Sequence, residues 1–229
     1  MLIAGLTGSI AMGKSTVADM IAANGIPMIS ADQIVHDLYD GPIAADIEAA
    51  FPGSTKPNDS SGDHKLSVDR QALMKSLNGQ PELFKKLEAI IHPLVRKEEW
   101  AFIEKQKNLG AELILIEIPL LFETGAEALM DMVILASATS EDQRRRALAR
   151  PGMTEEKLDL ILKKQLPDHI KREKADLIIN TSLSLEETDE EVKNAITAMK
   201  SRAQQMANKP DNKDSAYQRW AAEMANLTE

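Results

Sequence analysis

A glycine-rich stretch near the amino terminus, residues 8–16, most constrains how this chain can fold. Its residues, Gly-Ser-Ile-Ala-Met-Gly-Lys-Ser-Thr, have the G-x-x-x-x-G-K-[ST] spacing of loops that wrap a chain of phosphates. Glycine at both ends of such a loop lets the backbone turn tightly, and the turn points successive N–H groups at an anion. A helix that begins at about Gly13 would direct its positive dipole end to the same anion.

The flanking residues provide the strand and the helix that this motif requires. The apolar run at residues 2–6 predicts a buried strand, and residues 15–23 predict a helix. We expect Lys14 among the β- and γ-phosphates, Ser15 on Mg²⁺, and Thr16 at the phosphate nearest the nucleoside. The residues expected to bind the nucleotide through this loop are Gly8, Ala11, Met12, Gly13, Lys14, Ser15 and Thr16.

Composition narrows the class of protein further. With 229 residues, 43% of them hydrophobic, the chain can form one α/β domain with an insertion. A net charge of −9 argues against a general binder of nucleic acid or acidic membranes, and the absence of cysteine excludes disulfides and thiolate metal sites. The chain shows neither a membrane-length apolar run nor a signal-peptide pattern. We therefore expect a cytoplasmic protein. We also expect this protein to act on a small-molecule substrate and to be a monomer or a small homo-oligomer, although composition alone does not establish either point.

Short apolar runs alternate with helical patterns along the rest of the chain, as in an α/β protein with a parallel sheet. Further strands are expected at residues 26–30, 112–119, 131–136 and 176–180. Further helices are expected at residues 33–38, 69–77, 81–91, 94–107, 154–165, 185–206 and 216–225. Residues 52–69 are polar and predict a surface loop, and the dipeptide His92-Pro93 predicts a break between two helices.

Two carboxylates follow expected strands of this sheet. Ligands bind beyond the carboxyl ends of the strands in open parallel sheets, and Asp32 and Glu117 fall there. A carboxylate in this place can accept a hydroxyl proton or bind Mg²⁺ through water. Capping of the helix at residues 33–38 is an equally good interpretation of Asp32, and it is compatible with catalysis.

His92 stands alone at the expected helix break. For such a histidine, a structural hydrogen bond is the favoured interpretation. The alternative is a phosphate or pyrophosphate site shared with Arg96, which lies four residues on and therefore on the same helical face.

A basic cluster, residues 143–150, predicts a lid over the transferring phosphate. Arg146 and Arg150 are four residues apart, so we expect both on one helical face, directed at the site. Arg144 and Arg145 are expected to be more exposed. A solvated basic face is the alternative interpretation of the whole cluster.

Several of these stretches together resemble the dephospho-CoA kinases, over about residues 1–200. The phosphate loop alone occurs in many families, whereas His-Pro-Leu-Val-Arg followed by Pro-Leu-Leu-Phe-Glu is much more selective. The matching stretches are residues 5–8, 13–16, 31–32, 92–96, 119–123, Gln143 with Arg146 and Arg150, Gln165, and 175–180.

The resemblance implies a P-loop NTPase-type parallel sheet flanked by helices, with a helical acceptor-binding insertion and a lid. It also implies that ATP, with Mg²⁺, phosphorylates the ribose 3′-hydroxyl of dephospho-CoA to give CoA and ADP. The implied parts are a kinase domain at residues 1–206, with its core at 1–39 and 108–206, an insertion at 40–107, a lid at about 140–165, and a linker with a tail helix at 207–229.

The resemblance also implies roles for individual residues. Asp32 is the implied general base, and Lys14, Arg146 and Arg150 would offset charge on the transferring group. Asn180 would approach the adenine of ATP. The residues expected to bind the acceptor are Asp32, His36, His92, Arg96 and Glu117.

The sequence departs from the family pattern in three places that matter. Ser30 replaces an aspartate, His36 stands where arginine is common, and in the loop Ser9 and Met12 replace small residues, Met12 being bulky for this loop. The change at His36 keeps open a kinase for another nucleoside or nucleotide. A GTP-dependent switch is a second alternative, but the guanine-reading pattern N-K-x-D, at residues 208–211, follows an expected helix instead of a strand.

Overall fold

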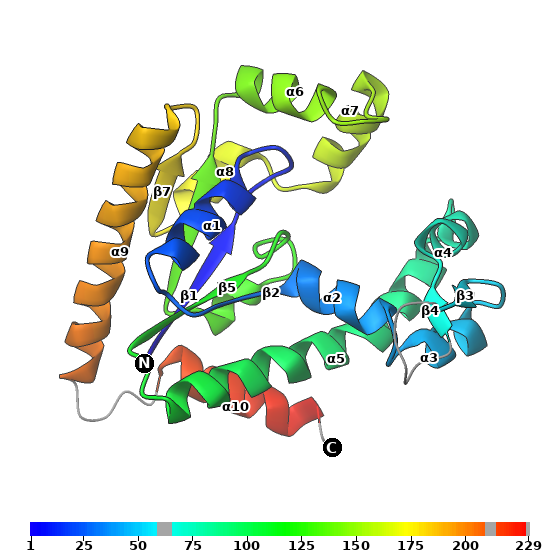
Figure 1. Cartoon of the computed structure of the whole chain (residues 1–229), viewed down its shortest axis with the longest axis horizontal. Helices are drawn as coiled ribbons and strands as arrows, with labels where there is room; N and C mark the ends of the chain where they lie inside the picture. Colours follow the sequence, from blue (N-terminus) through cyan, green and yellow to red (C-terminus); the bar gives the residue numbers. More distant parts are fainter. Residues whose placement is uncertain (59–65, 209–213, 228–229) are drawn as a thin grey trace. The chain divides into compact units, whose positions relative to one another are not determined.

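The computed structural model describes residues 1–58, 66–208 and 214–227 (Figure 1). These residues form two compact units, one of Met1–Ser30 with Phe102–Glu229 and one of Ala31–Ala101. Part of the expected loop, residues 59–65, and part of the N-K-x-D pattern, residues 209–211, lie outside the described residues.

A five-stranded parallel sheet forms the centre of the first unit, as the sequence predicts. The strand order is β2-β5-β1-β6-β7, and every neighbouring pair is parallel. All residues of the central strand are buried, because it has a neighbour on each side and side-chain layers on both faces. The bounds are β1 (Leu2–Thr7), β2 (Met28–Ser30), β5 (Leu113–Glu117), β6 (Met132–Ser137) and β7 (Leu177–Asn180).

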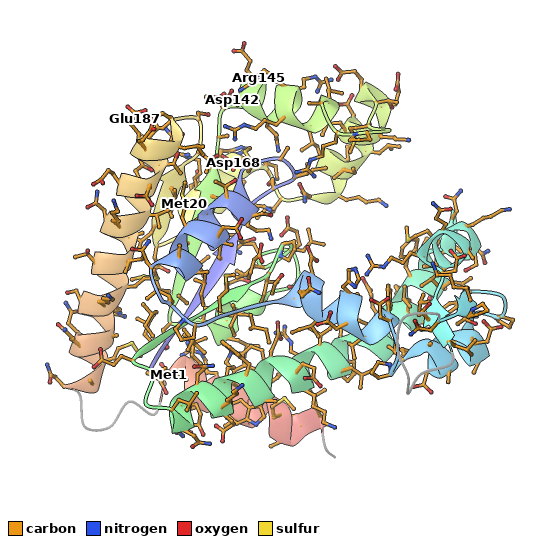
Figure 2. The ribbon with its side chains drawn as sticks, in the orientation of Figure 1. Met1, Met20, Asp142, Arg145, Asp168 and Glu187 are labelled. Carbon is orange, nitrogen blue, oxygen red and sulfur yellow. The ribbon has the colours of Figure 1, made fainter. Side chains whose placement is uncertain are left out.

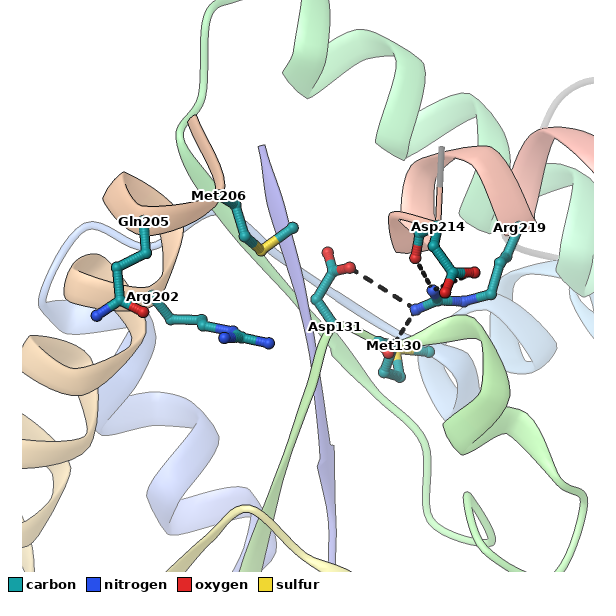
Figure 3. Close-up of a pocket in the computed structure, with 7 residues that line it drawn as sticks. All are labelled: Met130, Asp131, Arg202, Gln205, Met206, Asp214 and Arg219. Atoms are coloured by element: carbon teal, nitrogen blue, oxygen red, sulfur yellow. Dashed lines mark hydrogen bonds and ion pairs between the residues drawn. The ribbon is translucent and has the colours of Figure 1, made fainter. Parts of the chain in front are cut away.

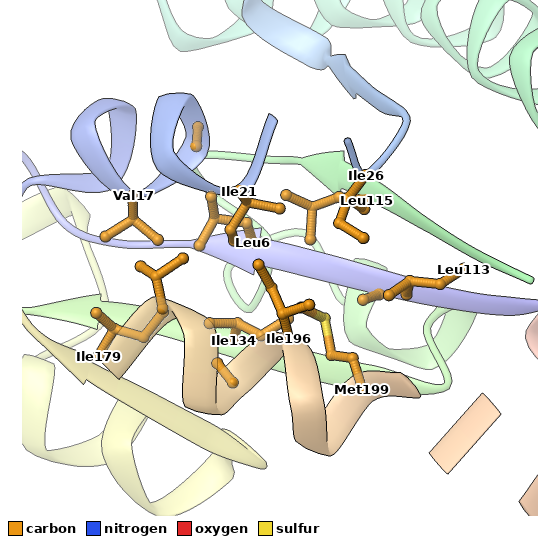
Figure 4. Close-up of a cluster of buried hydrophobic side chains, with 14 of the residues drawn as sticks. Leu6, Val17, Ile21, Ile26, Leu113, Leu115, Ile134, Ile179, Ile196 and Met199 are labelled. Carbon is orange, nitrogen blue, oxygen red and sulfur yellow. The ribbon is translucent and has the colours of Figure 1, made fainter. Parts of the chain in front are cut away.

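Two helices, α1 (Lys14–Ala23) and α9 (Leu185–Ala207), cover one face of this sheet (Figure 4). Alternate residues of a strand point to the same face, so Leu2, Ala4 and Leu6 of β1 all contribute to this cluster. The cluster holds α1 against the sheet, and the first turn of α1 is the end of the glycine-rich loop.

The last helix, α10 (Ala216–Leu227), packs against β1 and the 3-10 turn η1 (Ala126–Leu129) in the same unit. Trp220 is fully buried there. The two carboxylate oxygens of Asp131 accept one hydrogen bond each, from the Ile3 N–H at 2.9 Å and from the Ala216 N–H at 2.7 Å. This carboxylate therefore ties the start of β1 to the start of α10.

Three further helices follow β6 in the first unit. They are α6 (Ser140–Leu148), α7 (Glu155–Lys164) and α8 (Asp168–Lys174). The sequence analysis expected α7 and placed no helix at α8, which begins one residue after Pro167 and has only seven residues.

The second unit is mostly helical. The sequence analysis did not expect its two-stranded antiparallel hairpin, β3–β4, inside the polar loop at residues 52–69. The bounds are α2 (Ala31–Tyr39), α3 (Ala44–Ala50), β3 (Thr55–Pro57), β4 (Leu66–Val68), α4 (Arg70–Leu77) and the first part of α5 (Pro81–Asn108). Within the described ranges, no helix combines the length and the apolar character needed to cross a membrane.

Two local predictions are wrong. α5 is one helix with Pro93 inside it, so the predicted break at His92-Pro93 does not occur. Proline removes one backbone hydrogen bond, but the buried side chains Ile91 and Val95 on either side of it favour a continuous helix. α2 begins at Ala31, so Asp32 lies in its first turn and does not cap it.

Candidate active site

The glycine-rich loop joins the end of β1 to the start of α1, which is the context that its motif requires. Gly13 caps α1 with φ 79°, and Ala11 has φ 61°. These left-handed conformations turn the loop back toward the helix, and glycine adopts them at little cost. Ser15 and Thr16 lie exposed on the first turn of α1, where a phosphate can reach them.

Both motif glycines also sit against neighbouring atoms that leave no room for a side chain. A Cβ on Gly8 would lie 2.8 Å from the Ala136 carbonyl oxygen. A Cβ on Gly13 would lie 2.8 Å from Thr181 Oγ1. The loop is therefore packed from outside by the residues at the ends of β6 and β7.

Met12, the bulky departure from the family pattern, points into this packing. It is 2% exposed, and its sulfur accepts a hydrogen bond from the Ala138 N–H at 3.1 Å. The Met12 side chain therefore packs away from the inner side of the loop, and backbone groups line that side.

Two glutamines hold the backbone of Ile10. The Ile10 N–H donates to Gln165 Oε1 at 3.0 Å, and Gln143 Nε2 donates to the Ile10 carbonyl at 2.9 Å. Both glutamines belong to the segment expected to form the lid, so this segment is bonded directly to the phosphate loop. The sequence analysis quoted both residues as family matches without giving them a role.

Arg146 and Thr181 form a second link to the loop. Thr181 Oγ1 donates to the Met12 carbonyl at 2.9 Å. The guanidinium of Arg146 donates to the Thr181 carbonyl at 2.5 Å and to Thr181 Oγ1 at 3.2 Å. Arg146, a basic residue of the predicted cluster, is therefore linked to the phosphate loop through a single intervening residue, Thr181.

Arg150 does not share a helical face with Arg146, contrary to what the sequence analysis expected. α6 ends at Leu148, so Arg150 lies beyond the helix and is exposed, and the prediction that it shares a helical face with Arg146 is wrong. The helix ends early because Pro151 disfavours a helical conformation in the residue before it.

The other two arginines are exposed, as expected. Arg144 pairs with Asp159 at 3.2 Å, and Arg145 pairs with Asp142 at 2.5 Å on the same helix (Figure 2). Hydrogen bonds from Ser182, Arg145 and Thr139 hold the pKa of Asp142 well below its usual range. These contacts fix the start of α6 beside the residues that follow β7.

The Lys14 ammonium and the Glu117 carboxylate form an ion pair at the end of the sheet. Both side chains are largely buried, with 13% and 9% of their surfaces exposed. In the sheet register Glu117 is paired with Ser30, the last residue of β2. The chain therefore places Asp32 two residues beyond the register partner of Glu117.

Asn180, expected near a nucleobase, is exposed at the end of β7. Its side-chain oxygen accepts the Ser182 N–H at 3.0 Å, and its own N–H donates to Glu191 at 2.6 Å. The side-chain amide nitrogen makes no hydrogen bond to any residue that the structure describes.

The second unit carries the remaining expected acceptor residues. Asp32 and His92 are exposed, and His36 pairs with Asp40 at 3.2 Å. No hydrogen bond of His92 is found within the described part of the chain, so the favoured structural interpretation of this residue is not confirmed. Arg96 donates to Glu99 at 3.1 Å.

Comparison with known proteins identifies the family. The dephospho-CoA kinase family model matches residues 2–187. The chain belongs to the dephospho-CoA kinase family.

Relatives and solved structures agree with this assignment. The chain is 50% identical to a dephospho-CoA kinase from Rhizobium etli, over 88% of its own length and 96% of that protein. It is 28% identical to the structure of dephospho-CoA kinase from Campylobacter jejuni, with TM-score 0.65 over 87% of this chain and 98% of that one. A structure from Thermus thermophilus is 32% identical, with TM-score 0.72 over 86% of this chain and 96% of that one. The P-loop kinase fold expected from the sequence is thereby confirmed.

This kinase also has a hollow near the amino-terminal ends of β1 and β6 (Figure 3). It has a volume of about 240 Å³ and is bordered by the end of α9, the start of α10 and the residues before β6. Because Asp131 in this hollow bonds to the start of β1, the hollow lies away from the phosphate loop at the end of that strand.

A buried glutamate in the kinase was not found from the sequence. Glu99 is 1% exposed, and its partner Arg96 belongs to the selective motif. Burial raises the pKa of Glu99 to about 7, against the lowering effect of the Arg96 guanidinium. A carboxylate on a charged helix looks solvated in sequence, so no local pattern reveals its burial.

Replacing Gly13 by alanine should weaken both the fold and nucleotide binding. We expect a loss of about 1–2 kcal/mol for the left-handed backbone and about 1–3 kcal/mol more for overlap with Thr181. Gly152→Ala is the matched control, because Gly152 has φ 73° and nothing within 4 Å of its Cβ position. Urea unfolding of both variants measures the difference, and equal losses would contradict the packing argument.

Glu99 should make the stability of the kinase fall as pH rises. Its pKa of about 7 lies above the unfolded value, so the folded chain holds a proton that the unfolded chain releases between about pH 4.5 and 7. The contribution of Glu99 to the free energy of unfolding should drop by up to about 3 kcal/mol across this window. This pH-dependent loss should be absent from Glu99→Gln. Urea unfolding at pH 5, 6, 7 and 8 tests this, with Glu98→Gln as an exposed control. Parallel curves for wild type and Glu99→Gln would disprove it.

Proposed function

We propose that this kinase transfers the γ-phosphoryl group of ATP to the ribose 3′-hydroxyl of dephospho-CoA. The observation that carries the proposal is the phosphate loop with its largely buried Lys14–Glu117 pair, in a chain that the family model matches over residues 2–187. In the reaction the acceptor oxygen bonds to the γ-phosphorus, the bond from that phosphorus to the bridging oxygen breaks, and ADP leaves.

The loop supplies the positive charge that an acidic protein needs at a phosphate site. Its inward N–H groups and the start of α1 bind the phosphates of ATP. Glu117 keeps the Lys14 ammonium beside the loop, so this cation is already in place for the β- and γ-phosphates. Arg146 lies one residue from the loop, through Thr181, and adds charge on the lid side. Arg150 would contribute as a second lid arginine.

Magnesium accompanies ATP in this proposal, and the residues present are suited to it. Mg²⁺ bound with phosphates needs only one or two protein oxygens, and the Ser15 hydroxyl is exposed on the first turn of α1. Ser15 would therefore hold the ion. When bound, Mg²⁺ neutralises charge on the phosphates during transfer.

Asp32 acts as the general base in this mechanism. It is exposed, and it follows the strand that pairs with the one ending at Glu117. It would orient the acceptor hydroxyl and take its proton as the new bond forms. His36, His92 and Arg96 would bind the anionic acceptor, and Asn180 would contact the adenine of ATP. A cytoplasmic location and a monomer or small homo-oligomer remain predictions.

The first experiment is to measure ADP release with ATP and Mg²⁺, with and without dephospho-CoA. ADP that forms only with dephospho-CoA, together with CoA detected by mass spectrometry, is the expected result. A panel of nucleosides and nucleoside monophosphates run alongside tests the other acceptor class that His36 keeps open. Turnover with one of those acceptors alone would discard the dephospho-CoA assignment.

Removing either charged group of the mechanism should reduce turnover. Lys14→Ala removes the cation at the β- and γ-phosphates, and Asp32→Asn removes the base; each should lower kcat by at least about 100-fold. Asp37→Asn, an exposed carboxylate on the same helix as Asp32, is the control and should stay near wild type. Near-normal turnover in Lys14→Ala or Asp32→Asn would remove that residue from the mechanism.

A further inference from the structure

Lys171 is a fully buried cation that the mechanism does not use. It lies in α8 with 0% exposure, and its Nζ is 2.8 Å from Glu123 Oε1. Burial of an ammonium group is costly unless a counter-charge accompanies it, and loss of one partner leaves the other uncompensated. Lys171 and Glu123 therefore hold each other in position through this ion pair.

The same carboxylate oxygen holds the end of the lid segment. Glu123 Oε1 also accepts the Leu166 N–H at 2.8 Å. The preceding residue, Gln165, accepts the Ile10 N–H of the phosphate loop. A continuous series of contacts thus runs from Lys171 through Glu123 and Leu166 to the loop.

The helix that carries Lys171 is itself fixed to the sheet. Asp168, the first residue of α8 (Figure 2), accepts the Ser137 hydroxyl at 2.8 Å, and Arg172 donates to the same hydroxyl oxygen at 2.9 Å. Ser137 ends β6. Since α8 is anchored at the sheet, Lys171 presents its charge to Glu123 from a fixed base.

We propose that Lys171 is a positioning residue for nucleotide binding. Its ammonium fixes the Glu123 carboxylate, Glu123 fixes the Leu166 backbone, and Gln165 then meets the Ile10 N–H and keeps the phosphate loop in shape. This inference rests on the proposed function only in taking a nucleoside polyphosphate as the ligand of the loop.

A double-mutant cycle tests whether Lys171 acts through Gln165. The dissociation constant of ADP with Mg²⁺ is measured by calorimetry for wild type, Lys171→Met, Gln165→Ala and the variant with both changes. Each single change should weaken binding by about tenfold, the scale of one hydrogen bond. The double variant should also be about tenfold weaker, because both changes break one link. If the double variant binds ADP about 100-fold more weakly than wild type, the two residues act independently and the proposal is overturned.

A control on the same helix separates this role from a general effect of losing a lysine. Lys174 pairs with Glu127 at 2.7 Å and is 43% exposed. Lys174→Met should leave the ADP dissociation constant within about twofold of wild type, as expected of a partly exposed ion pair. A tenfold change there, or wild-type binding in Lys171→Met, would overturn the proposal.

A purely stabilising role is tested by removing both members of the ion pair. The variant Glu123→Leu with Lys171→Met leaves neither partner unpaired, so its melting temperature should recover relative to Lys171→Met. It still lacks an acceptor for the Leu166 N–H, so ADP binding should stay about tenfold weaker. Recovery of binding together with stability would overturn the proposal. If Lys171→Met alone does not fold, the cycle with Gln165→Ala is run in this variant.

The binding readout also separates failure of this inference from failure of the proposed function. Wild-type protein that binds ADP but forms no CoA would discard the acceptor assignment and leave the cycle fully interpretable. Wild-type protein that does not bind ADP would overturn both.

Discussion

The structure depends on a loop whose backbone N–H groups must face an anion. A backbone turned in this way directs other polar groups outward, and buried backbone groups require partners. Here the partners come from distant segments: Gln143 and Gln165 bond to Ile10, and Thr181 bonds to Met12. The segment after β6 and the residues after β7 are therefore bonded to the glycine-rich loop, and they complete the hydrogen bonding that the loop cannot provide for itself.

Electrostatics follows from the same requirement. A chain with net charge −9 must hold its cations locally to bind phosphates. Lys14 is kept by a carboxylate at the end of β5, and Arg146 is kept by the carbonyl and hydroxyl of Thr181. A side chain held in place before binding loses less conformational freedom when the ligand arrives. In the proposed mechanism, the ion pair with Glu117 would order the Lys14 cation before the nucleotide binds.

Local rules explain what the sequence predicted and where prediction stopped. The loop, the five strands and most helices depend on motif spacing and apolar periodicity, which a single sequence displays. The continuous helix through Pro93 depends on tertiary packing, and the burial of Lys171 and Glu99 depends on partners and neighbours brought by the fold. Arg150 was misplaced by a helix boundary alone. Sequence reasoning therefore proposes candidate residues where chemistry follows a motif, and it misses residues whose role is to position another side chain.

Two of the departures from the family pattern, Met12 and His36, have different physical meanings. Met12 turns its side chain into the protein and accepts the Ala138 N–H, so the loop still presents backbone to the ligand. Backbone recognition is insensitive to the identity of a side chain that points away. His36 is half exposed and carries its chemistry in the side chain, which pairs with Asp40. A change from arginine to histidine there removes a fixed charge and a planar donor fork. We therefore expect a substitution at His36 to alter acceptor binding more than a substitution at Met12 alters nucleotide binding.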